Sequence, residues 1–342
     1  MLDEIVIKLI EQSSNILIIS SVPYDADCIA SGILIKKYLE SLNKRVLLVC
    51  PIQPERINKS YFNFLSGLPY SDEMLLKDTR SIDFSQFDTA FLVDGRSYDQ
   101  FYDIQSASER PFNINIIPTR IHIDHHAPAT DPIGTYIIHN QKVSSCTELI
   151  LETVVPTTFL NKDLAYIAYN ALVGDTGNFR WNTYSSTLKL AGDLLEHEFD
   201  IQPIVNNMFN EKSNKYFKLL QWCLNTVQYD DKSSTLFLEI SKENCRQEQF
   251  SQEDILEIRE VFTNEIARRV NHYPRGIILI EQESVIEIRA IGNNLENKIN
   301  LSLLLKKVGG SGAGHPQYAN AIIQGTISDI KISLIKSIIQ DI

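Results

Sequence analysis

The sequence has few cysteines, no paired-cysteine motif and no long apolar run. Its cysteines form no CxxC pair and are odd in number, which argues against a disulfide framework and a thiolate zinc site. No apolar run approaches the roughly 18 residues that a membrane-spanning helix needs, and the opening Met1-Leu2-Asp3-Glu4 lacks the basic region of a secretory signal. We therefore expect a cytoplasmic protein with no membrane partner and mostly buried free thiols. The cysteines are Cys28, Cys50, Cys146, Cys223 and Cys245.

Basic residues are fewer than acidic ones. The 32 lysines and arginines face 43 acidic residues, which gives a formal charge of -11. Such a surface repels a polyanion such as duplex DNA along most of its area. Small phosphorylated substrates remain compatible, because a few local cations or metal ions reverse the potential inside a cleft.

With only 14 glycines and 12 prolines in 342 residues, the composition excludes a collagenous or low-complexity chain and indicates a globular one. The length exceeds one ordinary core, so two domains are expected. In the first domain, short apolar runs alternate with segments whose apolar residues have helical spacing. This alternation predicts an α/β fold with a parallel sheet. The expected strands are 15–19, 45–50, 89–93 and 120–123, and the expected helices 28–39, 143–155, 162–172 and 185–196.

The second domain also has an α/β pattern. Strands are expected at 235–240, 276–280 and 285–290 and a helix at 252–270. Another helix is expected after the glycine-rich 309–315, and the apolar spacing near the end of the chain predicts a final helix.

Acidic and imidazole residues follow several of the expected strands. Asp25 and Asp27 share one loop, Asp94 follows a strand, and Asp124-His125-His126 follow another. Asp175 lies in a Gly-Asp-Thr-Gly segment after an apolar helix. Parallel sheets bind ligands at the carboxyl ends of their strands. Carboxylates gathered there stay ionised only with cations between them, and oxygen and nitrogen ligands without thiolate suit Mn²⁺, Mg²⁺, Fe²⁺ or Zn²⁺.

Each piece also has an ordinary structural interpretation. An Asp-x-Asp loop is commonly a turn or a helix cap, and adjacent histidines occur on surfaces or in satisfied cores. Their joint placement after strands favours a site, because unrelated surface residues have no reason to share that position.

These segments resemble the four motifs of the DHH phosphoesterases. The similar motifs are Tyr24-Asp25-Ala26-Asp27, Val93-Asp94, Ile123-Asp124-His125-His126 and Gly174-Asp175-Thr176-Gly177-Asn178-Phe179. Ser144-Ser145-Cys146-Thr147-Glu148 is similar to the start of the helix after the third motif. Gly309 to His315 resembles the glycine-rich signature of the associated DHHA1 domain. Within this RecJ-like superfamily, the length and plan are most similar to the nanoRNase and 3'-phosphoadenosine-5'-phosphate phosphatase group.

The resemblance implies a two-domain α/β fold with the active site in the cleft between the domains. Residues 1–200 would be the catalytic, metal-binding DHH domain with a parallel sheet. Residues 201–225 would be a helical connector, and residues 226–342 a smaller substrate-binding DHHA1 domain.

The resemblance also implies a two-metal centre. Asp94 would bridge the ions, Asp25 would bind the first, and Asp27, His125 and Asp175 would bind the second. His126 would face the phosphate, and Asp124 would orient the imidazoles; His126, Asp124 and Asp94 are thus the expected catalytic residues.

Substrate contacts are expected from Arg289 and the glycine-rich loop, with Arg180 as a further candidate. Glycine lets backbone N–H groups approach phosphate oxygens, and arginine grips them with a planar fork. The plain alternatives are a structural turn and surface charges. The expected substrate-binding residues are His126, Arg180, Arg289, Gly310, Gly312, Gly314 and His315.

The chain departs from the family pattern at Ser21, where many members have a metal-binding histidine. The first metal would then have fewer protein ligands, another residue would replace the histidine, or the site would have lost one ion. The segment 127–130 also lacks an asparagine often found there, a contact to substrate in the family.

The sequence therefore predicts a metal-dependent phosphoesterase that hydrolyses short oligonucleotides, linear dinucleotides or nucleoside bisphosphates with metal-activated water. Two Mn²⁺ ions are expected, with Mg²⁺ as the other candidate, and a homodimer is compatible with the sequence. The alternatives are a phosphatase for polyphosphate or a small bisphosphate, and a weakly active regulatory nucleotide-binding relative.

Overall fold

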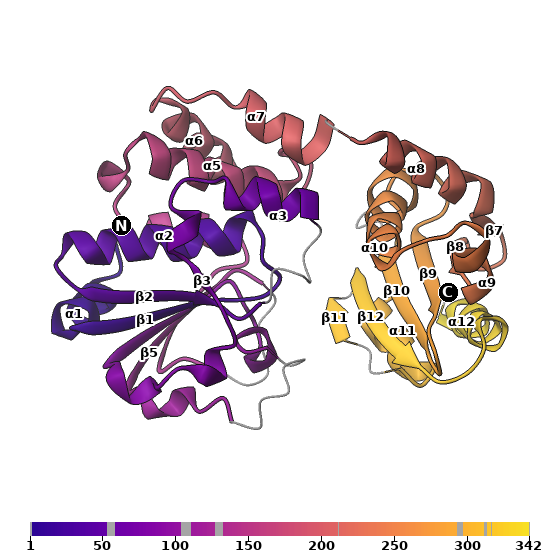
Figure 1. Ribbon diagram of the computed structural model, residues 1–342, viewed down its shortest axis with the longest axis horizontal. Coiled ribbons are helices and arrows are strands. Elements are labelled where there is room, and N and C mark those ends of the chain that lie inside the picture. Colours follow the sequence, from indigo (N-terminus) through magenta and orange to yellow (C-terminus); the bar gives the residue numbers. More distant parts are fainter. Residues whose placement is uncertain are drawn as a thin grey trace. The chain divides into compact units, whose positions relative to one another are not determined.

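The chain forms two compact units, shown in Figure 1, a computed structural model. It describes residues 2–52, 59–103, 111–126, 133–210, 212–292, 297–310, 313–315 and 317–341. The first unit is Met1–Glu211 and the second is Lys212–Ile342. The division falls inside the segment 201–225, expected as a connector, and the catalytic and substrate-binding roles of the two domains stay predictions.

The first unit is built on a six-stranded parallel sheet in the order β3-β2-β1-β4-β5-β6. The order reverses between β1 and β4, which is the switch point where open α/β sheets bind ligands. The strands are β1 (Asn15–Ser20), β2 (Arg45–Cys50), β3 (Leu75–Leu76), β4 (Thr89–Val93), β5 (Thr119–Asp124) and β6 (Tyr136–His139).

Strand β1 is apolar at successive positions because both faces of the sheet are covered. Ile16 and Ile18 pack into the large core cluster that includes helix α2 (Ala26–Ser41). Leu17 and Ile19 point to the opposite face and join a cluster that contains Phe101. All four side chains of this run are fully buried, so the run predicted a strand of a doubly covered parallel sheet correctly.

The helices expected in the first unit are confirmed, with small differences at their ends. Their starts carry side-chain caps: Asp25 caps α2, Ser145 caps α4 and Asn161 caps α5. The helices are α1 (Glu4–Gln12), α2, α3 (Lys59–Ser66), α4 (Cys146–Thr153), α5 (Lys162–Thr176), α6 (Ser185–Leu195) and α7 (Gln202–Val205), followed by the π-helical Asn206–Asn210.

The second unit contains a mixed sheet in the order β11-β12-β10-β9-β8-β7. Only β8 and β9 pair in parallel among the described strand pairs of this sheet; the others are antiparallel. The strands are β7 (Gln228–Asp230), β8 (Thr235–Ile240), β9 (Arg275–Glu281), β10 (Ile286–Gly292), β11 (Ala313–His315) and β12 (Tyr318–Ile323).

Helices cover this second sheet on both faces. Helix α8 (Asn214–Thr226) buries Tyr216, Leu219 and Cys223 in one cluster of the second unit, so this part of the expected connector belongs to that unit's core. The other helices are α9 (Lys242–Gln247), α10 (Gln252–Val261), α11 (Leu301–Lys307) and α12 (Ile327–Asp341). Within the described residues, none of the helices has both the length and the apolar character needed to cross a bilayer.

Two expectations for the second unit were wrong in detail. The helix expected at 252–270 is α-helical only to Val261 and continues as the π-helical Phe262–Ala267. The segment directly after the glycine-rich loop is not a helix but strand β12. Ala319, Ala321 and Ile323 alternate along it and bury into one core cluster, a period of two that specifies a strand.

We predict that two glycine-to-alanine substitutions in the first unit have opposite effects on stability. At Gly32 in α2, a Cβ atom would lie 2.5 Å from Ser20 Oγ and 2.7 Å from Leu48 Cδ1. Gly32→Ala should therefore lower the free energy of unfolding by about 1–3 kcal/mol through overpacking. Urea unfolding monitored by circular dichroism measures the change.

Gly192 in α6 is the matched control, because it is exposed and a Cβ atom there meets nothing within 4 Å. Gly192→Ala should raise the free energy of unfolding by about 0.5–1 kcal/mol through helix propensity. An equal or greater stability for Gly32→Ala would show that α2 does not approach β1 as closely as described.

Candidate metal centre

The acidic and imidazole side chains identified in the sequence gather at the carboxyl ends of three neighbouring strands. Asp27 lies in the first turn of α2, just beyond β1. Asp94 follows β4 directly, and His125 follows β5. The last turn of α5 adds Asp175. The switch point of the sheet therefore brings together residues that are far apart in the sequence.

The carboxylate of Asp27 is held by the start of α4. Its Oδ2 accepts a hydrogen bond from the Cys146 backbone N at 2.7 Å, and its Oδ1 accepts one from the Thr147 backbone N at 2.8 Å. The side chain is almost fully buried. These two amide donors at the N-terminus of α4 therefore fix the orientation of the Asp27 carboxylate.

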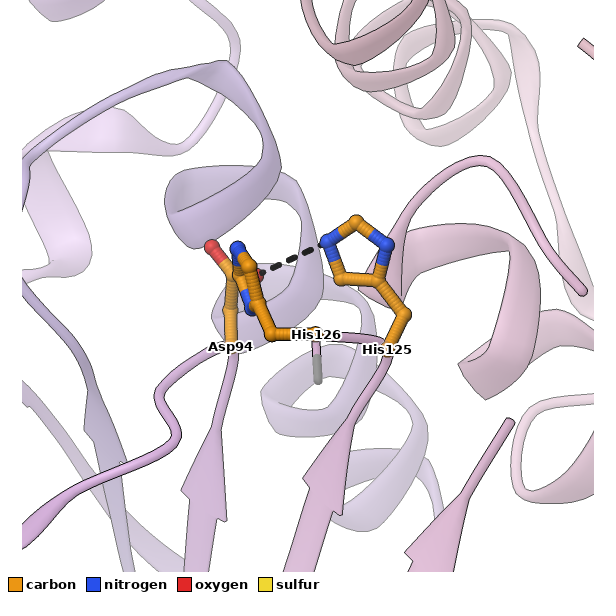
Figure 2. A group of neighbouring side chains, drawn as sticks. All are labelled: Asp94, His125 and His126. Atoms are coloured by element: carbon orange, nitrogen blue, oxygen red, sulfur yellow. Dashed lines mark ion pairs between the residues drawn. The ribbon is translucent and has the colours of Figure 1, made fainter. Parts of the chain in front are cut away.

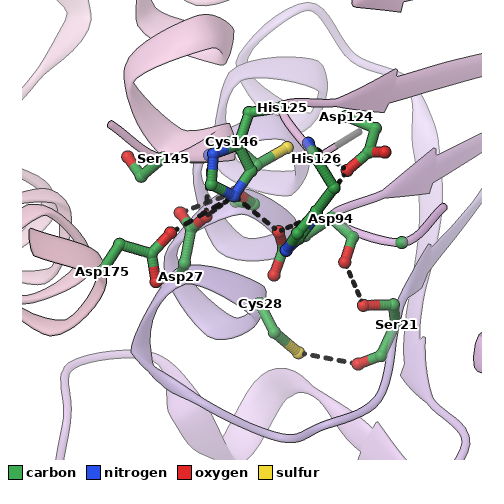
Figure 3. A network of polar contacts seen from close by, with 12 residues as sticks. Ser21, Asp27, Cys28, Asp94, Asp124, His125, His126, Ser145, Cys146 and Asp175 are labelled. Carbon is green, nitrogen blue, oxygen red and sulfur yellow. Dashed lines mark hydrogen bonds and ion pairs between the residues drawn. The ribbon is translucent and has the colours of Figure 1, made fainter. Parts of the chain in front are cut away.

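His125 lies at the centre of the carboxylates. Its Nε2 is 3.3 Å from Asp175 Oδ2, 3.6 Å from Asp94 Oδ1 and 3.9 Å from Asp27 Oδ2; Figure 3 shows these side chains converging from different elements. Asp27, His125 and Asp175 offer ligand atoms close enough together to hold one metal ion. Mixed carboxylate and imidazole donors suit a divalent transition metal.

A second such group combines Asp94 with both histidines (Figure 2). His126 Nδ1 lies 3.9 Å from Asp94 Oδ1 and 2.7 Å from Asp124 Oδ1. Asp124 thus holds the ring of His126, as an orienting carboxylate beside a metal-site imidazole does. The two groups share His125, so they adjoin each other.

The surroundings of the Asp94 carboxyl group favour a cation bound beside it. Its Oδ1 is buried and has no hydrogen-bond partner among the described residues. Burial, followed by the charges of Asp27, Asp25 and Asp175, raises the pKa of Asp94 well above its usual range. Burial and the charges of Asp27 and Asp25 raise the pKa of Asp175 in the same direction. A divalent ion bound by these residues would offset the repulsion among the carboxylates and would give Asp94 Oδ1 a partner.

The two histidines have different electrostatic surroundings. Burial lowers the pKa of His125 and outweighs the nearby Asp27 charge, which favours the neutral imidazole that binds metal. Burial also opposes protonation of His126, but its hydrogen bond to Asp124 and the charge of that carboxylate raise the pKa of His126 overall.

Asp25 is near the centre but belongs to neither ligand group. Its Oδ1 accepts a hydrogen bond from the Cys28 backbone N at 2.9 Å and caps α2. Burial raises the pKa of Asp25 to about 6, with the charge of Asp27 as a further cause. The role of Asp25 at the first metal stays a prediction.

Ser21, at the position where many family members have histidine, does not direct its hydroxyl to the carboxylates. Its Oγ donates a hydrogen bond to the backbone carbonyl of Asp94, and its own carbonyl accepts from the Cys28 thiol at 3.2 Å and the Cys50 thiol at 3.4 Å. The side chain is fully buried. Ser21 therefore supports the backbone under Asp94.

Arg180 lies in the first unit shortly after Asp175. Its Nε donates to the Gly177 carbonyl at 2.5 Å, and its guanidinium lies 4.7 Å from the Trp181 ring centroid and 5.3 Å from the Phe209 ring centroid. The residue is exposed. These contacts hold the arginine at the surface of the first unit.

The remaining predicted substrate residues belong to the second unit. Arg289 lies on β10, with its guanidinium 5.6 Å from the Tyr318 ring centroid and its Nη1 3.9 Å from Glu260 Oε1. Its Nε has no hydrogen-bond partner among the described residues. The residue is thus held by weak contacts on a sheet face rather than by a close ion pair.

The glycine-rich loop is described in part. Gly310 packs so closely that a Cβ atom there would lie 2.6 Å from the Ala321 Cβ. Gly314 and His315 form part of β11 and pair with β12. Gly312 and the segment 127–130 lie outside the described residues. Close packing against Ala321 therefore explains the glycine at position 310 without any ligand.

Asp27 is positioned by a contact that its sequence motif does not reveal. The backbone N–H groups of Cys146 and Thr147 do so, and Glu148 lies directly after them. The pattern Ser145-x-x-Glu148 indicates the start of a helix. It does not indicate which distant carboxylate accepts hydrogen bonds from the N-terminal amides of that helix.

The family comparison covers most of the first unit. Residues 15–172 match the DHH family, N-terminal domain. A curated relative, the bifunctional oligoribonuclease and PAP phosphatase NrnA of Bacillus subtilis (strain 168), is 36% identical over 97 residues. That match spans 27% of this chain and 31% of the relative, so the chain matches about a third of the relative's length.

Solved structures share the fold. An exopolyphosphatase-related protein from Bacteroides fragilis superposes with a TM-score of 0.80 at 20% identity, over 98% of this chain and 95% of that one. RecJ in complex with Mn²⁺ from Thermus thermophilus has a TM-score of 0.50 at 13% identity, over 98% of this chain and 54% of that one. The first of these extends the likeness through both units. Residues 15–172 of this chain are thus similar to the DHH family, N-terminal domain, and the solved structures share the fold.

Proposed function

We propose that this protein is a metal-dependent phosphoesterase that acts on short nucleotide substrates. The proposed substrates are short oligonucleotides, linear dinucleotides and nucleoside bisphosphates. One observation carries the proposal: His125 lies within 4 Å of three buried or half-buried carboxylates, and Asp94 Oδ1 has no hydrogen-bond partner among the described residues. Carboxylate oxygens grouped around an imidazole nitrogen are typical ligands of a divalent metal ion.

Asp27, His125 and Asp175 would hold the second ion, and Asp94 would lie between it and the first. His126 and Asp25 border the first position. When bound, a pair of divalent ions neutralises phosphate charge and activates water for in-line attack. We propose Mn²⁺ as the resident ion and Mg²⁺ as the other candidate, since both accept oxygen ligands and Mn²⁺ also takes imidazole readily.

The chain's own residues orient the reaction. Asp124 accepts from His126 Nδ1 and so leaves Nε2 as the outward nitrogen of that ring. The raised pKa of His126 favours a ring that donates to a phosphate oxygen. We propose that this histidine contacts the scissile phosphate and helps to hold it for attack.

The second unit would grip the rest of the substrate. We propose that Arg289, Gly310, Gly312, Gly314 and His315 bind the terminal phosphate or nucleotide, with Arg180 as a contact from the first unit. Two features support this: the Arg289 Nε has no described partner, and guanidinium groups recognise phosphate in a planar fork.

The proposed substrates are short because the charge of the chain is unfavourable for long ones. A formal charge of -11 repels a polyanion outside a local cationic site. The name of the Bacillus subtilis relative includes oligoribonuclease and PAP phosphatase, which supports small nucleotides as substrates here. The cytoplasmic location and the homodimer stay predictions.

Ser21 favours a weak first metal position over a fully ligated one. Its hydroxyl donates to a backbone carbonyl, so we propose that the first ion has fewer protein ligands and more water. A regulatory protein that binds nucleotide without cleaving it is the alternative that this feature motivates. Hydrolysis of polyphosphate or a small bisphosphate is the enzymatic alternative, and it requires no base to stack on an aromatic ring.

We predict that Asp175→Asn abolishes most activity. The amide keeps the shape of the side chain but removes the charge nearest His125 Nε2. We expect hydrolysis of a dinucleotide and of a nucleoside bisphosphate with Mn²⁺ to fall at least about 100-fold. Product release measured by chromatography tests this, with polyphosphate as the comparison substrate.

Asp193→Asn is the matched control, since Asp193 is exposed on α6; it should keep the wild-type rate. Full activity in Asp175→Asn would refute the assigned site. Cleavage of polyphosphate alone would favour the second enzyme class, and nucleotide binding without any cleavage would favour the regulatory alternative.

We predict that Ser21→Ala changes Mn²⁺ affinity by less than about threefold, because the hydroxyl is not a ligand. The loss of its hydrogen bond to the Asp94 carbonyl should instead lower the free energy of unfolding by about 1–3 kcal/mol. Mn²⁺ titration by electron paramagnetic resonance and urea unfolding separate the two effects. A large loss of Mn²⁺ affinity would mean that Ser21 does contribute a ligand.

A further inference from the structure

A buried carboxylate outside the metal-ligand groups has an extensive hydrogen-bond network. Glu148 in the first turn of α4 is fully buried. Its Oε2 accepts from the Ser144 backbone N at 2.9 Å, the Ser144 Oγ at 2.6 Å and the Thr187 Oγ1 at 2.8 Å. Its Oε1 accepts from the Ser186 Oγ at 2.8 Å. Donors from two separate segments therefore converge on one carboxylate.

This network explains how the carboxylate is tolerated in the interior. A buried charge is costly unless several hydrogen bonds compensate it, and none of the ion pairs described for the chain involves Glu148. Glu148 therefore fixes the loop before α4 to the first turn of α6, which supplies Ser186 and Thr187.

The loop that Glu148 fixes contacts one of the candidate metal ligands, Asp27. The backbone N–H groups of Cys146 and Thr147 donate to both oxygens of its carboxylate. Figure 3 shows Ser145 and Cys146 beside Asp27 and His125. A shift of this loop would therefore misalign the Asp27 carboxylate relative to His125 and Asp175 of the same ligand group.

We propose that Glu148 is a positioning residue that sets the metal affinity of the Asp27–His125–Asp175 group. It acts through the Ser144–Thr147 backbone and does not touch the metal itself. The inference rests on the proposed metal centre. Outer partners that orient metal ligands typically change metal affinity 10- to 100-fold when they are removed.

Glu148→Gln tests the proposal in the full-length protein. The amide keeps the side-chain volume but removes the charge and converts one acceptor into a donor. We expect about tenfold weaker Mn²⁺ binding by electron paramagnetic resonance titration. Glu152→Gln on the exposed side of the same helix is the matched control and should bind Mn²⁺ as the wild type does.

Ser186→Ala provides a milder test that retains Glu148 and preserves the fold. It removes the one hydrogen bond described at Oε1, and we expect about threefold weaker Mn²⁺ binding. Ser185→Ala, at the neighbouring exposed position, is its control and should have no effect. A purely structural Glu148 would lower the urea midpoint of both variants and leave the Mn²⁺ affinity of the folded protein unchanged, which would overturn the proposal.

The outcomes also separate this proposal from the proposed function. If the wild type binds Mn²⁺ and Asp175→Asn does not, but Glu148→Gln binds like the wild type, only the role of Glu148 is refuted. If the wild type binds no Mn²⁺, the metal centre is refuted and the role of Glu148 with it.

Discussion

Electrostatic repulsion among buried carboxylates is the constraint on which the first unit depends. Asp27, Asp94 and Asp175 lie around a single imidazole nitrogen, and burial raises the pKa of Asp94 and Asp175. A protein that needed only stability would place apolar side chains here, since charges are expensive to remove from water. Keeping them together is a cost that a divalent cation offsets.

The rest of the unit supplies a rigid frame for that arrangement. The parallel strands end at one edge, and their doubly covered faces leave little freedom to the residues that follow them. Helix starts contribute as well: α2 is capped by Asp25, and α4 directs two amides at Asp27. Polar groups are held in place by backbone that is itself buried, which is how a site keeps its geometry without its ligand.

The departure at Ser21 shows how a local change is accommodated in such a frame. The serine hydroxyl, together with the Cys28 and Cys50 thiols, fills the space beneath Asp94 with small groups that bond to the backbone. At this position the chain therefore has a hydroxyl that bonds to the backbone, and the proposed asymmetry between two metal positions rests on this one side chain.

The sequence by itself determined the alternation of buried strands with helices and the pairs and triplets of polar residues that follow β1, β4 and β5. These are local properties. An apolar run such as Ile16–Ile19 specifies a strand that is covered on both faces, and a residue that directly follows a parallel strand lies at the carboxyl end of the sheet. It did not determine the short strands β3, β6 and β11, because two to four residues carry too little periodicity. Three contacts depend on the tertiary structure alone. The amides of α4 donate to Asp27, Glu148 accepts hydrogen bonds from α6, and the Ser21 hydroxyl donates to a backbone carbonyl and not to a carboxylate. Those contacts join residues far apart in the chain, and side-chain direction at such a contact depends on packing from several elements at once.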